Sequence, residues 1–135
     1  DLGVISTDSG SGDSIPTAIS SIDLEANAEF TVIEVQGPDE AIIAARTWSE
    51  SQIARNGTDP IVILLDNMGP SACGSTGEVL KSLGLREWCI LEGSGGIKRE
   101  DLPSWAESSG VDVLSSSEVN MNSGTLDFSM LIEGI

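Results

Sequence analysis

The chain has 135 residues, of which 39% are hydrophobic, and it carries 22 acidic against six basic side chains, for a net charge of −16. The length suits one modest domain, and a hydrophobic fraction of this size argues against disorder. The surplus of carboxylates excludes nucleic-acid binding, which needs clustered Lys and Arg. The sequence contains no run of about 18 apolar residues, so no membrane span is predicted.

The first predicted elements, in chain order, are a linker and a short helix. Residues 1–14 are rich in Ser, Gly and Asp and are predicted to be a loop or linker. A weak helical pattern begins at Ile15. We therefore assign residues 1–29 to a linker with an initial helix, and residues 30–135 to the main domain.

Strands and helices then alternate. Strands are predicted at about residues 30–35, 61–65, 88–92 and 111–115. The second of these is a continuous apolar run, which is typical of a strand buried on both faces of a parallel sheet. Helices are predicted from Pro38, in the second half of the following connection with Gly84 as its C-cap, and before Gly110. The alternation predicts an α/β fold, with about four βα units of a larger parallel β/α barrel.

Acidic and small polar residues stand where the predicted strands end. In chain order these are Glu34, then Asp66 and Asn67, then Glu92 with Ser94, Gly95 and Gly96, and last Ser115, Ser116 and Ser117. Ligands of parallel α/β folds bind at the carboxyl ends of the strands, where carboxylates hold Mg²⁺ and backbone N–H groups hold phosphate. Each feature alone has a structural explanation, since Asp66 could cap the next helix and Gly95–Gly96 could be a plain turn. Together they favour a metal and phosphate site.

Five segments resemble, in order, the C-terminal part of quinolinate phosphoribosyltransferase, also called nicotinate-nucleotide pyrophosphorylase. The segments are "IEV", "ILLDNM", "LEGSGGI", "GVDVLSSS" and "LDFSM". That family typically reads E-V-E-V, L-L-D-N-M, L-E-A-S-G-G-I, G-V-D-V-I-S-V-G and L-D-F-S-L. The resemblance, which covers about residues 30–135, implies an enzyme of NAD biosynthesis. Quinolinate would attack the anomeric carbon of phosphoribosyl pyrophosphate, pyrophosphate would leave, and decarboxylation would give nicotinate mononucleotide.

The resemblance also implies roles for individual residues. Glu34 and Asp66 match acids beside the ribose hydroxyls and Mg²⁺, and so would be both catalytic residues and metal ligands. Asn67 and Glu92 would contact substrate. A phosphate-binding role would fall to Ser94, Gly95, Gly96, Ser115 and Ser117. The implied ligands are phosphoribosyl pyrophosphate, a pyridine carboxylate and Mg²⁺.

Some positions depart from the family pattern. Ser117 stands where the family has Gly, and it is followed by Glu118, whose carboxylate would repel a phosphate unless it points away. The basic residues that hold quinolinate in the family have no counterpart in residues 1–29, which contain no Lys or Arg. We interpret the six bases present as solvated. We therefore expect a homo-oligomer, or an N-terminal segment or separate chain, to supply the cations.

Two alternatives stay open. One is a nicotinate phosphoribosyltransferase, which shares the barrel and an S-G-G loop. The other is a degenerate, non-catalytic homologue that serves as a scaffold or assembly subunit. A few βα units leave sheet edges exposed, so we also expect residues 1–135 alone not to form a stable monomer.

Charge and cysteine content bear on the environment. The acids are scattered rather than in blocks, which favours a surface adapted to high salt over an acidic partner-binding face. Cys73 and Cys89 form no C-x-x-C pair, and histidine is absent, so a disulfide framework or a zinc site is not expected. No signal peptide is visible, and we expect a cytoplasmic protein with reduced thiols. The chain begins at Asp1 rather than Met, and we expect a further segment upstream of it.

Overall fold

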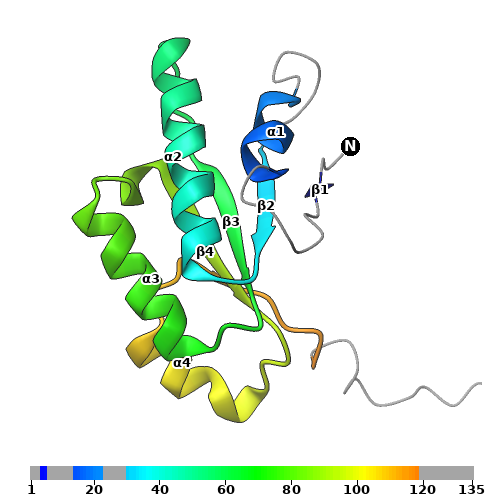
Figure 1. Ribbon diagram of the computed structural model, residues 1–135. Helices are drawn as coiled ribbons and strands as arrows, with labels where there is room; N and C mark the ends of the chain where they lie inside the picture. Colours follow the sequence, from blue (N-terminus) through cyan, green and yellow to red (C-terminus); the bar gives the residue numbers. More distant parts are fainter. Residues whose placement is uncertain (1–3, 6–13, 23–29, 119–135) are drawn as a thin grey trace, which may run out of the picture.

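The computed structural model describes residues 4–5, 14–22 and 30–118, which form one parallel sheet with helices packed against it (Figure 1). The strands stand in the sheet in the order of the sequence, and each pairs in parallel with the next. They are β1 (Val4–Ile5), β2 (Val32–Val35), β3 (Ile61–Asp66), β4 (Cys89–Ser94) and β5 (Val113–Leu114). The predicted α/β class and the parallel pairing are confirmed.

Helices fill the connections between successive strands. They are α1 (Ser14–Ser20), α2 (Pro38–Ala54), α3 (Pro70–Ser82) and α4 (Leu102–Ser108), with 3₁₀ turns η1 (Arg86–Trp88) and η2 (Arg99–Asp101). Successive helices contact one another side by side, α1 with α2, α2 with α3, and α3 with α4. A parallel sheet in chain order beside a row of helices is the arrangement of part of a β/α barrel. None of the helices in the described ranges has the length and apolarity needed to cross a membrane.

Local residue choice explains where the helices begin and end. Proline occupies the first turn of both α2 and α3, where its missing N–H costs nothing. Gly84 follows α3 with φ +67°, and Gly110 follows α4 with φ +57°, as their predicted roles as helix stops require. Helix α3 begins at Pro70, so it is longer than the half-connection that the sequence predicts.

Two features of the sheet differ from the sequence prediction. The pattern does not predict β1, because a two-residue strand in a Ser- and Gly-rich segment leaves no periodicity; Val4 pairs with Val32 and Ile5 with Ile33. Strand β4 continues to Ser94, so Glu92 lies within the strand and not at the start of the loop.

The core lies between the sheet and the helices. The buried side chains of the strands alternate along β2, β3 and β4, and they are Ile33, Val35, Ile61, Ile63, Leu65, Cys89 and Leu91. Trp48 of α2 is also buried, and its indole N–H donates to the carbonyl of Asp59 at 2.7 Å. The prediction that the Ile61–Leu65 strand is buried on both faces is wrong, because Val62 and Leu64 are only half-buried. This half-open face of the sheet carries the predicted site residues.

Candidate functional site

Four predicted site residues share the half-open face of the sheet. Glu34, Asp66, Glu92 and Ser94 are all half-buried and alternate with the core residues of their strands. Glu34 and Glu92 both pair with Leu64, one from each side, so their Cα atoms are two strand spacings or roughly 10 Å apart. Asp66 lies two residues further toward the carboxyl end of the sheet, roughly 7 Å along β3. The acids therefore share one face, with Asp66 at the rim and the two glutamates deeper.

Asp66 is held in place by the strand beside it. Ser94 Oγ donates to Asp66 Oδ1 at 2.8 Å, and Asn67 Nδ2 donates to Asp66 Oδ2 at 2.5 Å. The backbone N–H of Asn67 donates to the carbonyl of Ser94 at 3.1 Å. Asp66 does not cap the next helix, since the N-cap of α3 is Gly69 and has no side-chain hydrogen bond. Each oxygen of Asp66 keeps a lone pair that a ligand can use.

The turn after β4 exposes backbone donors beside Asp66. Gly95 and Gly96 have φ of +99° and +59°. Within the described ranges, the N–H groups of these two glycines form no hydrogen bond. Successive backbone N–H groups in a turn can form a concave surface that binds anions. A Cβ on Gly95 would overlap the side-chain oxygen of Asn67 and lie 2.8 Å from its Cα, whereas nothing lies within 4 Å of a Cβ on Gly96. The motifs "ILLDNM" and "LEGSGGI" are thus adjacent at Asn67 and Gly95.

The segment after β5 forms hydrogen bonds with β4 and with the loop that follows β4. Ser115 Oγ donates to Glu92 Oε1, which ties the carboxylate to the neighbouring strand end. Ser116 Oγ donates to the carbonyl of Ile97 at 2.5 Å, and the carboxylate of Glu118 accepts the N–H of Arg99. Ser117 is exposed, and no hydrogen bond of this residue is found in the described part of the chain.

Ser116 and Glu118, which the sequence analysis names at this strand end without a binding role, make these loop contacts. Strand β5 ends at Leu114, so the three serines lie in the loop that follows it.

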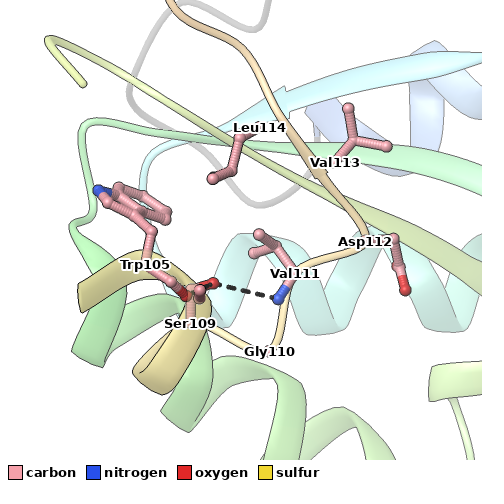
Figure 2. A pocket seen from close by; sticks show the side chains of 8 residues that line it. Trp105, Ser109, Gly110, Val111, Asp112, Val113 and Leu114 are labelled. Carbon is pink, nitrogen blue, oxygen red and sulfur yellow. Dashed lines mark hydrogen bonds between the residues drawn. The ribbon is translucent and has the colours of Figure 1, made fainter. Parts of the chain in front are cut away.

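A separate hollow of about 290 Å³ lies between α4 and β5 (Figure 2). Its walls come from α4 and the segment that leads into β5, namely Trp105, Ala106 and residues 109–114. None of the predicted site residues lines it. Its acidic group, Asp112, already accepts two bonds from Arg86 at 2.8 and 2.9 Å and the N–H of Leu91 at 2.8 Å. We interpret this hollow as a packing feature.

Comparison with known proteins identifies the family. Residues 9–131 match the model of the quinolinate phosphoribosyl transferase C-terminal domain. The chain belongs to this family. The predicted resemblance is confirmed.

Two relatives of this quinolinate phosphoribosyl transferase C-terminal domain are archaeal proteins described as probable carboxylating nicotinate-nucleotide pyrophosphorylases. The protein of Methanothermobacter thermautotrophicus is 37% identical over 103 residues, which cover 76% of the chain and 33% of the relative. That of Archaeoglobus fulgidus is 37% identical over 71 residues, which cover 53% and 27%. The chain thus spans about a third of the length of these curated relatives or less.

The fold is shared with a solved structure. The nicotinate-nucleotide pyrophosphorylase of Francisella tularensis superposes with a TM-score of 0.59 at 20% identity, covering 84% of the chain and 35% of that protein. The similarity supports the interpretation of the five-stranded sheet as part of a β/α barrel.

Two cations lie close in sequence to the phosphate turn of this quinolinate phosphoribosyl transferase domain. Lys98 and Arg99 follow the Gly95–Gly96 turn, are exposed, and form no ion pair with another described residue. Within residues 4–5, 14–22 and 30–118, no three or more His, Cys, Asp or Glu side chains gather as a metal cluster. Mg²⁺ often uses only one or two protein carboxylates together with substrate phosphates. Asp66, with its remaining lone pairs, fits that kind of site.

Proposed function

We propose that this chain forms the phosphoribosyl pyrophosphate side of a quinolinate phosphoribosyltransferase. The reaction joins the ring nitrogen of quinolinate to the anomeric carbon, releases pyrophosphate, and loses carbon dioxide to give nicotinate mononucleotide. Family membership and the names of the two archaeal relatives support this choice. The observation that carries it is the contact between Asp66–Asn67 and Ser94–Gly95, which places a fixed carboxylate beside backbone N–H groups that bond to no other described residue.

Different residues of the half-open face would bind the phosphate, the ribose and the metal ion. The N–H groups of Gly95 and Gly96 would hold the 5′-phosphate without side-chain charge, and the Ser94 hydroxyl would join them only by turning its one proton away from Asp66. Glu34 and Asp66 would face the ribose, where their negative charge stabilises the positive charge that develops at the anomeric carbon. Mg²⁺, when bound through Asp66 and Glu34, would neutralise charge on the pyrophosphate group.

The remaining predicted residues would act on substrate position. Asn67 would donate to the sugar or phosphate from the rim. Glu92, oriented by Ser115, would accept from a substrate hydroxyl. Ser115 would then be a positioning residue and not a phosphate ligand, and Ser117 stays a predicted phosphate ligand.

The site needs cations that the described residues do not supply at the half-open face. A pyridine dicarboxylate and a pyrophosphate together carry a large negative charge, which an acidic chain repels. Lys98 and Arg99 flank the phosphate turn, where they suit a phosphate better than a dicarboxylate. We therefore retain the proposal that another segment, another chain or a second copy completes the quinolinate site, in a protein that we expect to be cytoplasmic.

A non-catalytic homologue is the second candidate, because Glu118 already accepts a hydrogen bond from the loop after β4. A nicotinate phosphoribosyltransferase is less favoured, because the archaeal relatives are named as carboxylating enzymes.

Titration calorimetry of the complete protein, including any segment upstream of Asp1, with phosphoribosyl pyrophosphate and Mg²⁺ tests the proposal. We expect measurable binding by the wild type and at least a tenfold loss of affinity in Asp66→Asn, which removes a charge and leaves the shape. Asp59→Asn is the matched control, since Asp59 is exposed and lies before the amino end of β3. No heat in a folded wild type would leave the scaffold as the better explanation. In the complete enzyme, Asp66→Ala should abolish turnover of quinolinate while leaving the protein folded.

A further inference from the structure

Glu118 places a negative charge on the turn proposed for phosphate. Its carboxylate accepts the backbone N–H of Arg99, which follows the Gly95–Gly96 turn closely in the chain. The N–H of Glu118 donates to Ser116 Oγ at 3.2 Å, and Ser116 Oγ donates to the carbonyl of Ile97 at 2.5 Å. Hydrogen bonds thus hold the loop after β5 against the turn after β4, and one of the acceptors is the carboxylate of Glu118.

The same turn offers donors that Glu118 does not use. The N–H groups of Gly95 and Gly96 form no hydrogen bond within the described residues. Arg99 is three residues beyond Gly96, so their N–H groups are at most roughly 10 Å apart. That distance is close to the Debye length at physiological ionic strength, and shorter separations are screened still less. A phosphate on the glycine N–H groups would therefore interact unfavourably with Glu118.

We propose that Glu118 is an internal competitor for phosphate at the Gly95–Arg99 turn, and that it determines how tightly this site binds phosphate groups. The inference rests on the proposed function, because it takes this turn as the phosphate site. A phosphate gains the N–H of Arg99 only when the Glu118 carboxylate leaves it. With Glu118 in place, the phosphate is limited to Gly95 and Gly96 and is repelled by the carboxylate.

Two substitutions separate the charge of Glu118 from its role as the hydrogen-bond acceptor of the Arg99 N–H. Glu118→Gln keeps an oxygen that can accept the N–H of Arg99, but it removes the charge. Glu118→Ala removes both. Glu107→Gln is the matched control, because Glu107 is exposed on α4 and its substitution changes the net charge equally.

The measurement is a titration of the complete ¹⁵N-labelled protein with inorganic phosphate at constant ionic strength, following the backbone amide signals of Gly95, Gly96 and Arg99. We expect Glu118→Gln to bind phosphate roughly tenfold more tightly than the wild type, as removal of a nearby unit charge at a protein surface predicts. Glu118→Ala should bind at least as tightly, and its Arg99 amide should respond to phosphate together with the glycines. Glu107→Gln should behave like the wild type.

The other outcomes are also informative. Equal phosphate affinity in the wild type and Glu118→Gln, with a response at Gly95 and Gly96, would show that Glu118 only fastens the loops; the inference would fail and the proposed function would stand. No amide response to phosphate in any folded variant would overturn both. A weaker affinity in Glu118→Gln would also refute the competition.

Discussion

Replacing Gly95 and Gly96 separately by Ala should have unequal effects on stability, although the two glycines are adjacent. A side chain at Gly95 would overlap the Asn67 side-chain oxygen and lie 2.8 Å from the Asn67 Cα, and the residue has φ +99°. Strained backbone costs about 1–3 kcal/mol, and overpacking costs about 1–3 kcal/mol more. We therefore expect Gly95→Ala to lower the free energy of unfolding by about 2–6 kcal/mol.

Gly96 provides the comparison. Its φ of +59° lies in the ordinary left-handed region, and nothing is within 4 Å of the added Cβ. Only the conformational cost remains, so Gly96→Ala should lower the free energy of unfolding by about 1–2 kcal/mol. A Val side chain at Gly95 would likewise be directed at Asn67 and would distort the loop itself.

Urea denaturation, followed by tryptophan fluorescence at one fixed protein concentration, measures both values. A second variant tests the cause. Asn67→Gly should rescue Gly95→Ala only in part, because the contact at 2.8 Å is with a backbone atom that this substitution retains. Equal losses at Gly95 and Gly96, or full rescue by Asn67→Gly, would refute the reasoning.

Three further predictions concern the sheet, the thiols and the acidic surface. Gly93→Ala should destabilise the protein by about 1–3 kcal/mol and change the fluorescence of Trp105, because the new Cβ would overlap the Trp105 ring and lie 3.1 Å from Leu114 Cδ2; an unchanged denaturation midpoint would contradict this. Burial raises the pKa of the Cys89 thiol to about 11 from its ordinary 9.0, so the unfolded chain loses this proton first. The free energy of unfolding should then fall by up to about 1.4 kcal/mol per unit between roughly pH 9 and 11, and Cys89→Ala should remove that part of the slope in denaturation curves. If the net charge of −16 reflects a surface adapted to high salt, molar KCl should raise the melting temperature, whereas a flat or falling response would favour an acidic partner-binding face.

Local patterns in the sequence were sufficient to predict most of the secondary structure. The apolar run Ile61–Leu65, the proline at the start of α2 and the glycines after α3 and α4 each act within a few residues, so their effects are readable without tertiary contacts. The order of the motifs also led to the correct family. Strand β1 escaped prediction because its two residues are defined only by pairing with β2.

The contacts of the candidate site were decided by the tertiary structure. Ser94 and Asp66 are 28 residues apart in the chain, and only the β3–β4 register places them side by side. The contact of Glu118 with Arg99 depends on how the loop after β5 crosses the turn after β4. Sequence patterns determined which residues reach the carboxyl ends of the strands, because side-chain alternation is a local property. Which of them touch depends on register and loop geometry, because these follow from the packing of the whole sheet.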